Sequence, residues 1–263
     1  MLTTSEAARV VAVTASTIKR WADQGVLPFT RTAGGHRRFE RAAVDRLAAA
    51  QAGVEPSSWM HCLLGGRRHE VDGRLLEARA RLGAWHRVAD ELSGVLGELG
   101  RQWACGWLTI AEEHVATETL LRALARLGDA LPTRIDGPRA LLAVAPGDEH
   151  TLGLAMAELC LYEQGWSPIW LGRFTPIDEV LKLVSDGKLA MVVLTASAAN
   201  TKLRALREIA AKVGAACSKH GIDLVLGGGG PWPARPKHGA RLTSFNDFHQ
   251  HLTERTEQRT HGR

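Results

Sequence analysis

The spacing of hydrophobic positions divides the chain into parts with different periods. Through residues 59–130 apolar residues recur three and four positions apart without a proline, which predicts a bundle of about four helices. From residue 140, short apolar runs such as "ALLAVAP" and "LAMVVLTA" alternate with longer helical stretches. This alternation predicts a doubly wound parallel sheet, flavodoxin-like in type. The expected fold is therefore multidomain α and α/β, with a four-helix bundle at 57–131 and an α/β domain at 138–253.

The N-terminal segment has a pattern of two short helices joined by a tight turn. Thr4 or Ser5 can cap the first helix. The second, "ASTIKRWADQG", can begin at Thr14 or Ser16 and is ended by Gly25. A basic second helix after a tight turn is typical of a helix-turn-helix, whose second helix enters the major groove of DNA.

A Gly-Gly turn and a basic strand follow, and they predict a wing beside this DNA reader. Residues 1–50 hold eight Lys/Arg against four Asp/Glu, so most of the net charge of +5 lies there and favours a polyanionic partner. The alternative is a small helical domain with a solvated basic face. Residues 1–50 resemble the MerR-type winged helix-turn-helix. The resemblance implies that the second helix and the wing contact operator DNA through Thr17, Lys19, Arg20, His36, Arg37 and Arg38.

Composition indicates a soluble globular protein, with 45% hydrophobic and 23% charged residues. No apolar run approaches the roughly 20 residues that span a bilayer, so no membrane role is expected. The four cysteines lie far apart, which predicts neither a zinc site nor a disulfide framework and favours the cytoplasm. Small and polar residues at 48–58 and 132–139 predict linkers. Residues 254–263 are expected to form a disordered tail.

Polar residues follow several of the predicted strands, at the edge where ligands bind in parallel sheets. The first strand is followed by Asp148, His150 and Gly153, in the pattern Asp-x-His-x-x-Gly. Hydroxyl groups come at the end of the third strand, and glycines without side chains at the end of the fourth. No G-x-G-x-x-G or G-x-x-x-x-G-K-[ST] run is present, which argues against a nucleotide. Taken alone, a histidine at a strand end is usually an ordinary surface or core residue.

These three loops resemble base-off, His-on cobalamin-binding domains, which also carry a helical bundle ahead of the sheet. The resemblance implies that His150 is the lower axial cobalt ligand and Asp148 its hydrogen-bonded partner. It also implies that Gly153 lets the next helix begin close to the nucleotide tail of the vitamin. The tail itself is expected against Thr195, Ser197, Gly227 and Gly228. The usual Ser-x-Leu is "TAS" here, which keeps a hydroxyl and loses the leucine.

A second motif lies in the bundle, where Trp103 is followed nine residues later by Glu113 and His114. Trp103 could instead be a core residue and Glu113 a solvated one. The pattern resembles the CarH/CarA/LitR group of MerR-type cobalamin photoreceptors. The resemblance implies that the tryptophan covers the adenosyl group and that the glutamate helps to hold it. This chain departs from the group at Ala104, where a histidine is expected to take the upper cobalt position after illumination.

Together the resemblances imply a cytoplasmic transcriptional repressor that binds adenosylcobalamin and is no enzyme. In the dark it would assemble from dimer to tetramer and bind operator DNA, and light cleavage of the Co–C bond would release it. One alternative is a repressor of the same build that needs neither light nor vitamin and is controlled by an antirepressor protein. The other is a cobalamin-dependent enzyme, which the DNA-reading domain makes the weakest candidate.

Overall fold

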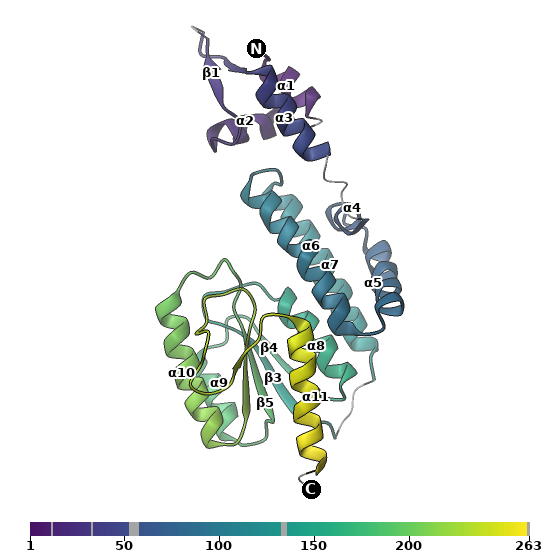
Figure 1. Cartoon of the computed structure of the whole chain (residues 1–263), viewed down its shortest axis with the longest axis vertical. Coiled ribbons are helices and arrows are strands. Elements are labelled where there is room, and N and C mark those ends of the chain that lie inside the picture. Colours follow the sequence, from purple (N-terminus) through teal and green to yellow (C-terminus); the bar gives the residue numbers. More distant parts are fainter. Residues whose placement is uncertain (12, 33, 53–57, 133–135, 262–263) are drawn as a thin grey trace. The chain divides into compact units, whose positions relative to one another are not determined.

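The computed structural model describes residues 1–11, 13–32, 34–52, 58–132 and 136–261 (Figure 1). These residues form two compact units. One consists of Met1–Val71 with Gly94–Thr119, and the other of Asp72–Ser93 with Leu120–Arg263. The division falls inside the bundle expected at 57–131, so the compact units do not coincide with the domain boundaries expected from the sequence. Within the described ranges, no helix has the length and apolar character needed to cross a membrane.

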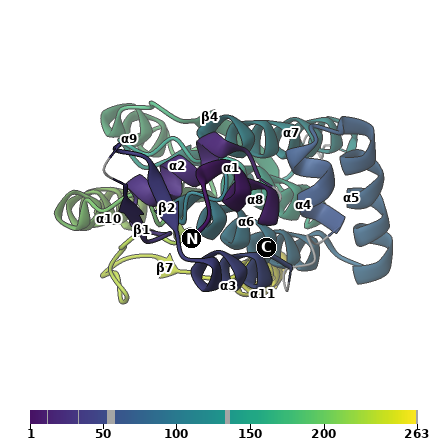
Figure 2. The same ribbon diagram turned by 90° about the horizontal axis from the view of Figure 1, so that it is seen from above.

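The N-terminal residues form the expected winged helix-turn-helix. Thr3 caps the first helix in a capping box with Glu6, so the expected cap at Thr4 or Ser5 is displaced by one residue. Thr14 caps the second helix, as expected. An antiparallel hairpin forms the wing (Figure 2), and Phe39 at its end is fully buried in the core of this segment. The elements are α1 (Thr4–Val10), α2 (Ala15–Asp23), β1 (Phe29–Arg31), β2 (Arg37–Phe39) and α3 (Arg41–Ala52).

Four helices follow, in agreement with the predicted bundle. The third of them is amphipathic and continuous over 20 residues, and it begins in one compact unit and ends in the other. The helices are α4 (Ser58–Leu64), α5 (Arg68–Leu82), α6 (Trp85–Ala104) and α7 (Ile110–Ala130). The linker expected at 48–58 is shorter than predicted, because α3 continues to Ala52 and α4 begins at Ser58. Residues 53–57 and 133–135 of the two expected linkers lie outside the described residues.

The α/β part contains a five-stranded parallel sheet with the strand order β4-β3-β5-β6-β7. This is the 2-1-3-4-5 order of flavodoxin-like folds, and it confirms the predicted fold class. Strands β3 and β5 have almost wholly buried side chains because both faces of the sheet are covered. The strands are β3 (Arg139–Val144), β4 (Ser167–Gly172), β5 (Met191–Thr195), β6 (Asp223–Gly227) and β7 (Ala240–Arg241).

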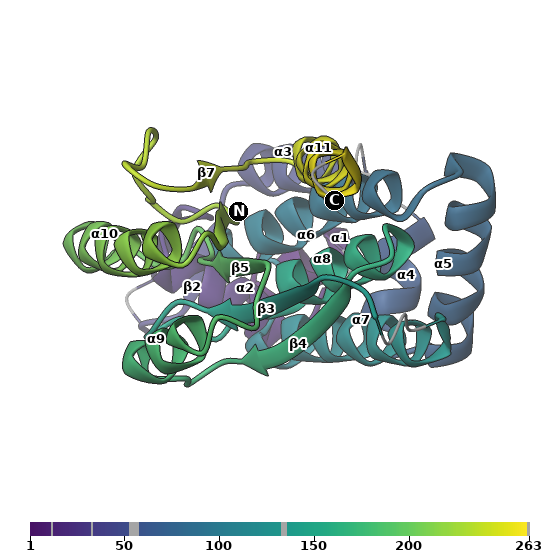
Figure 3. The ribbon, with the colours of Figure 1, turned by 90° about the horizontal axis from the view of Figure 1, so that it is seen from below.

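Helices cover both faces of this sheet. Figure 3 shows α9 and α10 on one side and α8 and α11 on the other. Val180 and Val184 of α9 and Val213 of α10 pack against Leu141 and Leu194 of the central strands. The helices are α8 (Leu152–Glu163), α9 (Ile177–Ser185), α10 (Leu203–Lys219) and α11 (Phe245–His261).

The expected disordered tail at 254–263 is wrong for the residues described, because α11 continues to His261. Its sequence is polar, and an isolated helix of such composition is marginal in water. Tertiary contacts hold it instead: Phe248 and Leu252 are buried, and Arg255 forms an ion pair with Asp223. The α/β domain therefore extends beyond the boundary expected at residue 253.

Candidate ligand-binding site

Asp148 joins two of the loops that follow the parallel strands. It lies in the turn after β3, and its side chain is only 1% exposed, while that of His150 is 61% exposed. Its Oδ1 accepts hydrogen bonds from His150 Nδ1 at 2.8 Å and from the His150 backbone N–H at 3.1 Å. Its Oδ2 accepts one from the backbone N–H of Ser197, in the loop after β5, at 2.5 Å. The predicted pairing of Asp148 with His150 is thus present in the geometry.

The charge of Asp148 is stabilised by these donors. Burial by itself would raise the pKa of this carboxyl, but the hydrogen bonds from His150 and Ser197 outweigh burial and hold the pKa well below its usual range. A carboxylate that accepts from Nδ1 fixes the tautomer of the imidazole. Nε2 of His150 is consequently the ring nitrogen that would coordinate a metal ion.

Three polar side-chain atoms at the end of β5 and in the loop after it are buried without a hydrogen-bond partner among the described residues: Thr195 Oγ1, Ser197 Oγ and Asn200 Nδ2. A buried donor left unsatisfied costs about 1–3 kcal/mol. Thr195 and Ser197 were expected here from the sequence. Their hydroxyls could bind the polar groups of a ligand that lies along this loop.

The loop after β6 packs directly on the loop after β5. A Cβ at Gly228, whose φ is +82°, would lie 2.3 Å from the carbonyl oxygen of Ala196. A Cβ at Gly230 would lie 2.6 Å from the Ala196 side chain, whereas one at Gly227 would meet only ordinary contact at 3.5 Å. Gly228 is therefore required by the backbone, and the rim it forms presents main chain rather than side chains.

Gly153 is the second residue of α8, and a Cβ there would meet nothing within 4 Å. The space above the first turn of this helix is open, as a close approach by a ligand requires. His150, Gly153 and the two packed loops thus gather at the carboxyl ends of β3, β5 and β6. A coordinating nitrogen, unsatisfied donors and bare backbone on one rim fit a large ligand that carries both a metal ion and a polar tail.

Asn200 is a candidate site residue that the sequence analysis missed. Its side chain is 6% exposed, and its Oδ1 accepts from the backbone N–H of Lys202 at 3.1 Å. This bond fixes the amide while its nitrogen remains without an acceptor in the described structure. The sequence contains no signal for it, because an asparagine in a polar loop is ordinarily solvated.

The bundle motif lies in the first compact unit. Trp103 is in the last turn of α6 and is 49% exposed, which is unusual for a large apolar ring. Glu113, in the first turn of α7, accepts a hydrogen bond at 2.6 Å from Nδ1 of the exposed His114. Trp103 is thus available to a ligand, and its alternative assignment as a core residue is not supported. Ala104 ends the helix directly after it.

The expected DNA-contacting residues lie on α2 and on the wing. Thr17 bonds to the side chain of Thr14 at 2.9 Å, and Lys19 is exposed on the following turn beside Arg20. His36 is exposed at the tip of the hairpin, and Arg38 is half-buried.

Arg37 differs from its neighbours on the wing because its guanidinium is used inside the domain. It is 17% exposed, pairs with Asp23 at 2.5 Å, donates to the carbonyl of Lys19 at 2.8 Å and lies over the ring of Phe29. Its position ties the wing to α2.

Three segments of this chain match families of known proteins. Residues 1–52 match the helix-turn-helix domain family, residues 138–238 match the B12 binding domain, and residues 59–127 match a second B12 binding domain family. The chain is similar to the monomethylamine corrinoid protein of Methanosarcina barkeri, with a TM-score of 0.59 and 16% identity over 74% of this chain and 95% of that one. At this identity the likeness concerns the fold alone.

Two curated relatives come from Myxococcus xanthus. The HTH-type transcriptional repressor CarH is 28% identical over 153 residues, 56% of this chain and 50% of that protein. The HTH-type transcriptional repressor CarA is 41% identical over 69 residues, 26% of this chain and 24% of that protein. The aligned region thus spans half of one relative and a quarter of the other. The chain thus combines a helix-turn-helix domain with two B12 binding domains, and parts of it are similar to the repressors CarH and CarA.

Proposed function

We propose that this protein is a transcriptional repressor that binds operator DNA through its winged helix-turn-helix and a cobalamin at the carboxyl ends of its parallel strands. The observation that carries the proposal is the pair formed by Asp148 and His150. Asp148 fixes the proton on Nδ1, and His150 would bind cobalt from below through Nε2. In this assignment His150 would coordinate cobalt and Asp148 would orient its ring, and neither residue has a catalytic role.

The nucleotide tail of the vitamin would lie between the loops that follow β5 and β6. Thr195, Ser197 and Asn200 supply buried hydrogen-bonding atoms that the described protein does not satisfy. Gly228 supplies backbone that a tail can approach closely. A ligand that satisfied these atoms would recover the free energy lost by burying them.

We further assign the adenosyl form of the vitamin, with Trp103 covering the adenosyl group and Glu113 accepting from its ribose hydroxyls. When bound, adenosylcobalamin supplies a cobalt–carbon bond that visible light cleaves. Loss of the adenosyl group would remove the contact that Trp103 and Glu113 would make with it. Copies of the chain would then separate, and a single reader would hold operator DNA far more weakly than several tethered readers.

Ala104 favours a second candidate function. Its methyl group has no donor atom, so the residue after Trp103 cannot take the upper position on cobalt. A chain without that capture residue could act as a repressor of the same build that responds to an antirepressor protein instead of light. DNA release would then require the partner protein.

Absorption spectra of the purified full chain with adenosylcobalamin, before and after green light, test the proposal. Binding should move the spectrum to that of a base-off, His-on corrinoid, and His150→Ala should abolish this change. Native mass and operator binding measured on the same samples should fall after illumination. Unchanged spectra would refute cobalamin binding, and unchanged mass and operator affinity after illumination would leave control by a partner protein as the better function.

A further inference from the structure

The C-terminal helix α11 is held by polar clusters as well as by its apolar residues. At its start, the backbone N–H groups of Phe245 and Asn246 donate to the carboxylate of Asp90 on α6, at 2.8 and 3.0 Å. One turn later the ring of His249 stacks on that of His86, also on α6, with centroids 3.9 Å apart and planes 17° apart. All of these residues belong to the second compact unit.

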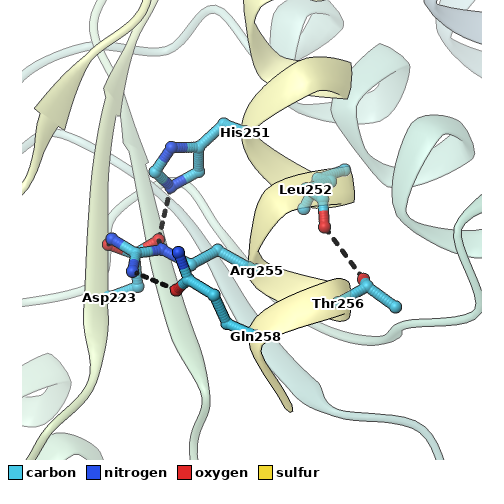
Figure 4. Close-up of polar contacts among 6 residues, drawn as sticks. All are labelled: Asp223, His251, Leu252, Arg255, Thr256 and Gln258. Carbon is cyan, nitrogen blue, oxygen red and sulfur yellow. Dashed lines mark hydrogen bonds and ion pairs between the residues drawn. The ribbon is translucent and has the colours of Figure 1, made fainter. Parts of the chain in front are cut away.

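A further cluster lies about a turn beyond the stack. The carboxylate of Asp223, at the start of β6, accepts from the ring of His251 and from two nitrogens of Arg255, each at 3.1 Å (Figure 4). The remaining guanidinium nitrogen of Arg255 donates to Gln258. Burial would raise the pKa of Asp223, but its hydrogen bonds and the positive charge of its neighbours hold that pKa below the usual value. The carboxylate of Asp223 therefore stays ionised in mild acid.

The surroundings of the His86–His249 stack favour neutral rings. His86 is 5% exposed, and its Nδ1 is buried without a hydrogen-bond partner in the described part of the chain. His249 Nδ1 lies 3.0 Å from the side-chain amide nitrogen of Gln164, which can only donate, so this Nδ1 accepts. A proton added to either ring would place a cation against the other ring in a site with little water.

The charged groups around the stack do not compensate for such a proton. On α6 Asp90 already accepts the two backbone bonds at the start of α11, and Arg87 adds a positive charge. On α8 Glu163 is the other nearby carboxylate. Burial first, and then the neighbouring His249, lower the pKa of His86 from its usual value near 6.5.

Glu163 is itself engaged. Its carboxylate accepts from Arg79 at 2.6 Å and from the backbone N–H of Trp85 at 2.9 Å. Both acidic neighbours of His86 are thus committed to other donors. A protonated imidazole at this position would find no carboxylate ready to receive it.

We propose that the His86–His249 stack makes α11 an acid-sensitive clasp on α6, which opens at its N-terminal half while Asp223 keeps the C-terminal half in place. Because the folded state disfavours protonated His86, the stabilisation by the stack is complete above the unfolded pKa of about 6.5 and is lost as the pH falls below it. The inference stands apart from cobalamin binding, since it concerns contacts within the chain alone.

Hydrogen exchange of the full chain without added corrinoid, measured at pH 7.5 and 5.5 and corrected for intrinsic rates, tests the clasp. In the wild type, protection in the first two turns of α11 and of α6 should fall by more than threefold and up to about tenfold on acidification, because a proton that binds only the open state with a pKa of about 6.5 is worth at most a factor of ten between these pH values. Protection near Arg255 should change less than threefold. His86→Phe keeps a flat ring that cannot take a proton, so its loss of protection should be less than threefold throughout.

Two further variants keep the test decisive. His249→Gln removes only the partly exposed ring, so its acid response should be smaller than that of the wild type but not abolished, because burial of His86 still disfavours the proton; it serves if the buried substitution does not fold. His220→Phe removes an exposed imidazole at the end of α10 and should retain the wild-type response. The clasp is overturned if wild-type protection is equal at the two pH values, if the stack variants respond as the wild type does, or if His220→Phe suppresses the response.

Discussion

Asp148 lies in the loop after β3 and accepts a hydrogen bond from the loop after β5. It therefore has a structural role in addition to its contact with His150. We expect Asp148→Asn to lower the free energy of unfolding of the corrinoid-free protein by about 1–3 kcal/mol, because it removes a charged acceptor from the Ser197 N–H. His150→Ala should lower that free energy by a smaller amount, since the ring is mostly exposed and is one of three donors to the carboxylate. Urea titrations of both variants measure the difference, and equal losses would contradict the bridging role of Asp148.

Glu158 on α8 provides a prediction about pH. Its burial, and then the nearby charge of Asp129, raise its pKa to about 7. The folded state therefore binds a proton that the unfolded chain releases near pH 4.5, and stability is lost as the pH rises from about 4.5 through 7.

We expect Glu158→Gln, which cannot ionise, to raise the free energy of unfolding by about 1–2 kcal/mol at pH 8 and to change it little at pH 5. Denaturant titrations at the two pH values measure this change. Asp186→Asn, at an exposed carboxyl after α9, serves as control and should show no such difference. An equal effect of Glu158→Gln at both pH values would argue against a buried protonated carboxyl.

Single residues differ in how far the sequence reveals their role. Asp148 and His150 are two positions apart, so their pairing is local and the motif predicts it. The burial of the Asn200 amide depends on how the loop after β5 folds against its neighbours, and no local pattern encodes that. Arg37 has the same charge as Arg38, and only the tertiary structure shows that Asp23 and Phe29 occupy it.

The wing illustrates the element scale, because its two arginines are expected to act differently. Arg37→Ala should lower the stability of the winged helix-turn-helix by about 1 kcal/mol, since it removes an ion pair and a backbone bond to α2. Arg38→Ala should leave stability within about 0.5 kcal/mol and weaken operator binding at every sequence, as loss of a phosphate contact does.

Thermal unfolding and binding titrations over a range of salt concentrations separate the two effects. Arg41→Ala, at an exposed arginine on α3 that pairs only with Asp45 one turn away among the described contacts, serves as control for a change of charge. Operator binding by Arg38→Ala with the affinity and salt dependence of the wild type would remove Arg38 from the DNA interface.

The elements themselves were largely predictable where apolar periodicity is strong, as in the buried strands β3 and β5. The last part of α11 was not, because residues 254–261, "ERTEQRTH", include no apolar residue and read as part of a polar tail. The partners of α11 are distant in sequence: Asp90 is 155 residues from Phe245, and Asp223 is 32 residues from Arg255. Contacts of this range cannot be derived from local composition.

At the scale of the whole molecule, the separation of a basic N-terminal reader from a nearly neutral remainder predicts how assembly should affect DNA binding. If copies assemble on adenosylcobalamin in the dark, more phosphates are neutralised in each complex, and the slope of log affinity against log salt should at least double on adding the cofactor. Green light should restore the original slope. Fluorescence anisotropy with a labelled operator measures both. A slope that did not change on adding the cofactor would mean that each complex contains a single winged helix-turn-helix.

The order of the helix-turn-helix, helical and α/β segments was predictable because each segment has its own period, but the boundary between the compact units was not. The chain crosses that boundary within α5, within α6 and within α7, and in each case the helix continues without a break. The apolar periodicity of a helix shows which face is buried but not which part of the protein each turn packs against.

The course of α6 also limits how this chain can be taken apart and recombined with others. A B12 binding domain excised at residue 138 would leave behind Asp90 and His86, so the first amides of α11 would lose their acceptors and His249 its stacking partner. The transferable module therefore begins no later than the start of α5 at Arg68. A gene fusion that began at residue 138, where the match to the B12 binding domain begins, would exclude α6. Its sheet would be present, but α11 would lack its contacts with α6. New sensors built from this chain should inherit α5, α6 and α7 together with the strands.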